Sequence, residues 1–175
     1  LKAQRTLIVG TTGGEFTVSA DGTDAAITPT NIVIKKQSSY GTANVDAIPA
    51  GNSILFLQKA KRKIRELSYN FDTDGYVAPD LTILTDIVTK SGINEMAYQQ
   101  EPDSILWCVR DDGILAGLTY QRSENVIAWH RHKLGGTFGA GASATGYGVV
   151  ESAASISGNL TEDEFYVIVK RTING

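Results

Sequence analysis

The chain has few of the residues that build disulfide-linked, zinc-bound or membrane-spanning folds. Cys108 is the only cysteine among 175 residues, which excludes an internal disulfide and a cysteine-based zinc site. No apolar run approaches the roughly 18 residues of a membrane span, and the first residues lack the basic segment, apolar run and cleavage site of a signal peptide. We therefore expect a soluble chain without a membrane partner.

Charge of one sign is also lacking. The 16 basic and 19 acidic residues are scattered along the chain and leave a formal net charge of −3. No strong field then exists to steer the protein onto nucleic acid, so we expect no nucleic-acid partner. With 42% apolar residues, the chain is long enough for one sizeable core and short for two. We therefore predict a single β-rich unit over residues 1–175.

The sequence does contain internal self-similarity. Residues 52–59 (NSILFLQK) align without a gap with residues 103–110 (DSILWCVR), at an offset of about 51 residues. A third copy begins at residue 163 and a fainter one at residue 6. Each copy indicates a strand, a polar turn and a second strand, and several turns carry the Asp-Gly or Asn-Gly pairs that suit tight hairpins.

The ungapped match makes two structural predictions. We expect the aligned positions to superpose and to face the same way, because slipping a strand by one residue would turn its apolar side chains to solvent. The pairs are Ile54 with Ile105, Phe56 with Trp107, and Tyr69 with Tyr120. We also expect Trp107, in the middle of an apolar strand, to be largely buried.

Together these patterns predict a mainly β fold. Further strands are expected at residues 31–35, 93–98 and 125–129, so that one copy with its flanking strands makes about four strands, the size of a propeller blade. We predict repeated antiparallel hairpins in a partial β-propeller-like arrangement. The blade-like repeats would lie at about residues 1–50, 51–101 and 102–160, with a truncated one at 161–175.

One short helix is expected near residues 80–90. Pro79-Asp80 supplies a start signal, Gly92 a stop, and Leu81, Leu84, Ile87 and Val88 fall on one face at helical spacing. Residues 135–148 are rich in Gly, Ala and Ser without apolar periodicity and indicate a long mobile loop.

Both ends of the chain indicate a fragment of a larger protein. The chain opens directly on a strand, and Asn174-Gly175 has the composition of a hairpin turn whose return strand would follow. The strand over residues 165–170 is then expected to be an incompletely paired edge.

His130 and His132 are the only histidines, and their spacing places both on one face of a strand, where they could share a metal ion. A metal site needs a third ligand and a fixed second shell, and no nearby Asp, Glu or Cys supplies them by spacing. The favoured interpretation is structural: Trp129 faces the core, while the two histidines and Arg131 decorate a strand end.

Other polar clusters also have simpler structural explanations. Asp72-Thr73-Asp74-Gly75 is similar to the start of a calcium loop, but the later oxygen ligands are missing, so a turn between a strand and the helix is favoured. The basic residues around Lys61 indicate a solvated hairpin turn, with an acidic partner surface as the weaker alternative. Five carboxylates could suggest acid/base chemistry, although their spacing does not pair them: Glu95, Glu101, Asp103, Asp111 and Asp112.

A set of segments resembles a known family. The segment IREL at 64–67, residues 75–82 (GYVAPDLT), residues 96–110 (MAYQQEPDSILWCVR) and the strand AWHRH at 128–132 occur in this order. The set is similar to the tail nozzle and tail-tube-associated structural proteins of bacteriophages and prophages, over roughly residues 30–134 and 165–175. The resemblance implies a virion component with propeller-like blades and no catalytic residues.

We therefore expect a structural component of a phage or prophage tail, made in the bacterial host cytoplasm and located in the virion. Its partners would be other phage tail proteins and copies of itself. We expect no enzyme, no catalytic, cofactor-binding or metal-binding residues, and no cofactor. The alternative is a carbohydrate-binding or carbohydrate-active β-propeller domain, which would show exposed aromatic side chains and convergent carboxylates in one pocket.

Overall fold

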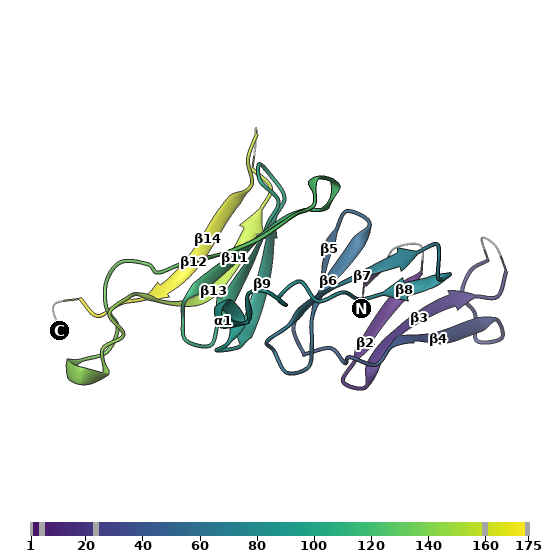
Figure 1. Ribbon diagram of the computed structural model, residues 1–175, viewed down its shortest axis with the longest axis horizontal. Coiled ribbons are helices and arrows are strands. Elements are labelled where there is room, and N and C mark those ends of the chain that lie inside the picture. The colour runs from purple at the N-terminus through teal and green to yellow at the C-terminus, as the bar shows by residue number, and fades with distance from the viewer. Residues whose placement is uncertain (1, 4–5, 23–24, 159–160, 174–175) are drawn as a thin grey trace. The chain divides into compact units, whose positions relative to one another are not determined.

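The computed structural model describes residues 2–3, 6–22, 25–158 and 161–173. Its contacts divide the chain into two compact units, Leu1–Leu81 and Thr82–Gly175, where the sequence analysis expected one. Each unit contains antiparallel sheets with little helix (Figure 1). The predicted mainly β class, with repeated antiparallel hairpins and one short helix, is confirmed.

The first unit contains two four-stranded antiparallel sheets, in the orders β1-β2-β3-β4 and β5-β6-β7-β8. Successive strands are neighbours in both sheets, so each sheet is a simple meander. The strands are β1 (Lys2–Ala3), β2 (Leu7–Thr11), β3 (Gly14–Ala20), β4 (Ile32–Ser38), β5 (Ile48–Ala50), β6 (Ser53–Leu57), β7 (Ile64–Asn70) and β8 (Gly75–Val77).

The second unit contains a third meander of four strands, in the order β12-β11-β10-β9, and a two-stranded sheet, β13-β14. Its helical elements are the one-turn helix α1 (Asp86–Thr89) and the short 3-10 turns η1 (Arg122–Glu124) and η2 (Gly141–Ser143). The strands are β9 (Ile93–Gln99), β10 (Ile105–Arg110), β11 (Leu115–Gln121), β12 (Val126–His132), β13 (Val149–Ile156) and β14 (Glu164–Lys170).

The four sequence copies each begin at the second strand of a sheet, namely β2, β6, β10 and β14. The residue ranges of the four sheets differ from the ranges expected for the blade-like repeats. β5 precedes residue 51 but pairs with β6, and β9 precedes residue 102 but pairs with β10. The sheets therefore span residues 2–38, 48–77, 93–132 and 149–170, because each copy's first flanking strand joins the hairpin that follows it. A propeller-like arrangement of these sheets stays a prediction.

The expected superposition of the β6 and β10 strands is wrong by one residue. Leu67 on β7 pairs with Ile54, whereas Leu118, its equivalent on β11, pairs with Leu106 and not with Ile105. The cause is loop length: the hydrogen bond from Gln58 N–H to Lys63 O closes a loop of residues 59–62, whereas the bond from Arg110 N–H to Ile114 O closes a loop of residues 111–113 only. Gly113, at φ 76°, closes this shorter turn in the left-handed conformation typical of three-residue hairpin loops. Loop length thus sets the register.

The one-residue difference changes which side chains are equivalent. Ile54 and Phe56 correspond to Leu106 and Cys108, which are fully buried, and not to Ile105 and Trp107. The expected match of Tyr69 with Tyr120 holds in strand position but not in environment, because Tyr69 is exposed and Tyr120 is buried.

Each unit has its own apolar core between sheets. In the first unit, Ile8 of the first sheet packs with residues of the second sheet: Ile54, Phe56, Leu67 and Ala78. In the second unit, one face of the β9–β12 sheet packs against the β13-β14 sheet. That core consists of Ala97, Val109, Leu115, Val150 and Ala153, with Trp107, Leu134, Phe165, Val167 and Val169 packed around it.

The helix near residues 80–90 exists only as one turn, and its expected apolar face does not form. Leu81 belongs to the first unit, where its backbone N–H donates to the carbonyl of Ile64 on β7. Val88 is buried, whereas Leu84 is 93% exposed. The helical spacing of these residues spans the boundary between two units, so they share no common core.

The glycine-rich residues 135–148 form a loop that is closed at its base. Gly148 donates its backbone N–H to the carbonyl of Leu134, and Thr172 donates to the carbonyl of Thr137 in the loop. The turn expected at Asn174-Gly175 lies outside the described residues. No helix in the described part of the chain is both long and apolar enough to cross a membrane.

Candidate functional site

The best-defined polar and aromatic cluster of the second unit lies on the β10–β12 strands. Trp107 pairs across the sheet with Gly117, and Gly117 pairs in turn with His130. Side chains of directly paired residues lie on the same face of a sheet, and alternate residues of a strand share a face. Trp107, His130 and His132 therefore project from one face, the face that packs against β13-β14.

This placement corrects the expected orientation of β12. β12 ends at His132, so the two histidines and Arg131 are the last three residues of the strand, as expected. Trp129 pairs with Leu118, and it therefore lies on the opposite face from the histidines. The sequence correctly indicated that alternate residues of β12 share a face. It could not indicate which of the two faces packs against the neighbouring sheet.

The two histidine rings are in direct contact. His130 Nδ1 and His132 Nε2 are 2.7 Å apart, within hydrogen-bonding distance, and the ring planes are nearly perpendicular at 88°. The Trp107 ring lies edge-on to both, with centroid distances of 5.7 Å to His130 and 5.2 Å to His132. His132 is exposed and His130 is half-buried, so solvent reaches this pair.

Trp107 itself is half-buried, so the prediction of a largely buried side chain is wrong in degree. Its ring stacks on Phe165 of β14 at a centroid distance of 4.6 Å, and its Nε1–H donates to Gln99 Oε1 at 2.9 Å. Aromatic stacking and a satisfied indole N–H both stabilise the contact between the two sheets. Trp107 thus connects the β9–β12 sheet to β14 through its ring.

Burial, and secondarily the nearby His132, lowers the pKa of His130 below its ordinary value near 6.5. The 2.7 Å contact is within the range of a hydrogen bond between the two imidazoles, with one ring nitrogen donating and the other accepting. If the shared hydrogen is lost to solvent, both facing ring nitrogens present a lone pair, and imidazole nitrogens are ligands for transition-metal ions.

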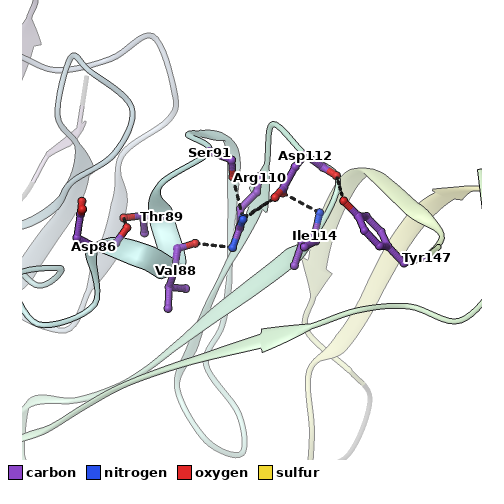
Figure 2. Close-up of polar contacts among 8 residues, drawn as sticks. All are labelled: Asp86, Val88, Thr89, Ser91, Arg110, Asp112, Ile114 and Tyr147. Atoms are coloured by element: carbon purple, nitrogen blue, oxygen red, sulfur yellow. Dashed lines mark hydrogen bonds and ion pairs between the residues drawn. The ribbon is translucent and has the colours of Figure 1, made fainter. Parts of the chain in front are cut away.

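A second cluster surrounds Arg110 at the end of β10 (Figure 2). The guanidinium is buried and donates to Val88 O at 2.7 Å, to Ser91 Oγ at 2.9 Å and to both carboxylate oxygens of Asp112, with Oδ2 at 2.5 Å and Oδ1 at 3.0 Å. Tyr147 Oη donates to Asp112 O at 3.1 Å, as Figure 2 also shows.

Together these bonds connect α1, the β10–β11 turn and the end of the glycine-rich loop. Every donor nitrogen of the guanidinium has a protein partner, so the cluster is structural and leaves no group aimed at a ligand. The sequence analysis missed it, although an Arg two residues before an Asp at a hairpin turn is a local signal for such an arrangement.

The other sequence candidates are explained by local structure. Residues 71–74 form a turn between β7 and β8, not between a strand and the helix, and Tyr69 Oη donates to Asp74 Oδ1 at 2.5 Å. In the basic cluster Arg65 is buried and not solvated: its guanidinium stacks over the Tyr40 ring at 3.4 Å and donates to Ala78 O. Lys63 forms a salt bridge with Asp80 at 3.0 Å.

Two of the five carboxylates singled out in the sequence have separate partners. Asp112 binds Arg110, and Glu95 accepts from Ser152 Oγ at 3.0 Å. Cys108 is fully buried, and this burial raises the pKa of its thiol far above the usual range, so it is not a nucleophile. Among the described residues, no group of three or more His, Cys, Asp or Glu side chains could hold a metal ion.

A groove on the first unit was also missed in the sequence. It has a volume of about 840 Å³, and its lining combines exposed aromatic rings with small polar residues. Phe71 is 86% exposed there, and Tyr69 and Tyr76 contact each other edge-to-face at a centroid distance of 5.7 Å. The lining residues are Thr6, Gly51, Asn52, Ser53, Ser68, Tyr69, Phe71 and Tyr76.

Comparisons with known proteins assign the chain to no family. No family model matches the sequence, and no curated protein matches it. The geometry described above is therefore the basis on which a function can be proposed.

Proposed function

We propose that this chain is a structural component of a phage or prophage tail and acts by protein–protein assembly. The observation that carries the proposal is the β13-β14 sheet. The other three sheets have four strands each, but this one has two, and the outer edge of β14 has no partner strand among the described residues. An unpaired edge presents a row of backbone N–H and C=O groups to which another chain can add a strand.

The faces of β14 differ in a way that suits assembly. Phe165, Val167 and Val169 pack against the core of the second unit. The opposite face carries Tyr166 and Ile168, which are 53% and 62% exposed, and Ile156 of β13 is exposed beside them. An open edge next to exposed apolar side chains is typical of strand-addition sites. The family resemblance supplies the partners: copies of this chain and other tail proteins.

Replacing Ile168 by lysine should weaken self-association of the purified chain by roughly tenfold or more in dissociation constant, because a charge on this face opposes apolar contact. Sedimentation velocity over a range of concentrations measures the effect. Leu84→Lys is the control, since Leu84 is 93% exposed but lies outside the strands, and the substitution should leave association unchanged.

A chain that stays strictly monomeric at high concentration, and that also fails to join particles of the phage whose genome encodes it, would contradict the proposal. The tail assignment is tested separately from self-association. An antibody against the chain should label the tails of purified particles in electron micrographs, and neighbouring genes should encode other virion proteins.

The groove around Phe71 supports a second candidate function, carbohydrate binding. Aromatic faces and small hydrogen-bonding groups are the side chains that bind sugars, and the volume of about 840 Å³ lies within the range of ligand pockets. Among the described residues no carboxylate lines the groove, so it suits binding and not hydrolysis.

Phe71→Ala should reduce the affinity for any bound oligosaccharide by roughly tenfold. A glycan array followed by calorimetry on the strongest binder measures it, with Phe138→Ala in the glycine-rich loop as a control outside the groove. Absence of glycan binding by the unsubstituted chain would exclude this candidate.

A further inference from the structure

We propose that His130 and His132 form a chelating site for a divalent transition-metal ion, with Cu²⁺ bound most tightly. The site lies in the second unit, whereas the aromatic groove lies in the first. Metal binding by the two histidines does not depend on the proposed tail function. It uses only the two facing imidazole nitrogens, and water completes the coordination on the exposed side of His132.

The distance between the nitrogens fits this chemistry. His130 Nδ1 and His132 Nε2 are 2.7 Å apart. Two nitrogens bound to one ion at about 2.0–2.1 Å, and separated by the right angle of tetragonal Cu²⁺, lie about 2.9 Å apart. If the two nitrogens move apart by about 0.2 Å and the exposed His132 ring rotates, a metal ion can take the place of the hydrogen that the two nitrogens share.

The backbone beneath the pair prearranges it. Gly117 lies directly opposite His130, and a Cβ built on Gly117 would lie 2.1 Å from Cε1 and 2.7 Å from Nδ1 of the imidazole. The ring therefore occupies the space that a side chain at position 117 would fill. With Trp107 edge-on to both rings, the histidines are held close together before any ion arrives. Prearranged ligands lower the entropic cost of binding.

The ranking of metals follows from the donor set. Imidazole nitrogens bind Cu²⁺ more tightly than Ni²⁺ or Zn²⁺, and a site with two protein ligands imposes too little geometry to reverse that order. Calcium and magnesium prefer oxygen ligands and should not compete.

Trp107 provides the readout, since its ring lies 5–6 Å from both imidazoles and bound Cu²⁺ quenches nearby indole emission. Trp129→Phe in an untagged chain leaves Trp107 as the only tryptophan. Titration with copper chloride should then quench emission saturably with one ion per chain, and zinc chloride should displace the copper at higher concentration. Non-saturable quenching, or no quenching, would overturn the proposal.

Three substitutions in this background test the ligands and their arrangement. His130→Gln and His132→Gln should each weaken copper binding by roughly 10- to 100-fold. Gly117→Ala should weaken it by roughly tenfold although both histidines remain, because the new methyl group displaces the His130 ring. Arg131→Gln, an exposed residue on the other face of β12, is the control and should change affinity by less than about twofold.

Unchanged copper affinity in both histidine variants would place the ion elsewhere, for example at the terminal amine, and overturn the site. Unchanged affinity in Gly117→Ala would overturn the prearranged chelate. Circular dichroism checks that each variant is folded. If Gly117→Ala does not fold, His132→Gln decides, since the side chain of His132 is exposed and its loss leaves the core intact.

Discussion

Trp107→Ala should lower the free energy of unfolding of the second unit by about 3 kcal/mol, the lower end of the range for large core aromatics. The ring is half-buried, which argues against a larger loss, but its removal ends the 4.6 Å stack on Phe165 and the hydrogen bond to Gln99. Urea unfolding followed by circular dichroism measures the change. Because the chain has two units, the transition of the second unit must be fitted separately.

Trp107→Phe is the matched control for this substitution. It keeps an aromatic ring against Phe165 and removes only the indole N–H, so it should cost about 1 kcal/mol. A loss below about 1 kcal/mol in Trp107→Ala would show that β14 is held to the β9–β12 sheet by other side chains.

Arg110→Met should destabilise the second unit by about 2–3 kcal/mol. The substitution keeps the length of the side chain but removes the guanidinium that donates to the carbonyl of Val88 and to the carboxylate of Asp112, which keeps only the backbone N–H of Ile114 as a donor among these bonds. The estimate stays below the full cost of breaking a buried ion pair because the side chain of Asp112 is 32% exposed and can be hydrated. The same urea experiment measures it.

Arg110→Lys separates charge from geometry. A lysine ammonium is a single point of charge without the planar fork of the guanidinium and cannot make all four contacts, so it should recover only part of the loss. Full recovery by lysine would mean that the charge alone matters and that the fork of hydrogen bonds in Figure 2 adds nothing. A loss under about 1 kcal/mol in Arg110→Met would contradict a structural role for the cluster.

Local pattern was sufficient to predict the elements. The local patterns at residues 31–35, 93–98 and 125–129 correctly indicated β4, β9 and β12, and the aligned copies correctly indicated hairpins. These signals work because strand formation and turn type depend on neighbouring residues. The helix was placed near its position but not at its true length, since its apparent apolar face combined residues of two separate units.

The candidate site shows where local pattern is insufficient. The i, i+2 spacing of His130 and His132 correctly placed both on one face, because the period of a strand is two. Their 2.7 Å contact, the space over Gly117 and the edge of Trp107 all depend on residues of three neighbouring strands. No spacing within β12 contains that information.

The sequence alone determined the mainly β class, the hairpin repeat and the histidine spacing, which are all properties of residues close along the chain. Tertiary structure decided the register of β10 against β11, the division into two units and the face on which the histidines lie. A turn shorter by one residue moved every pairing of that hairpin, since strand register is a relation between segments. Burial likewise depends on what the facing sheet supplies, as Phe165 does for Trp107.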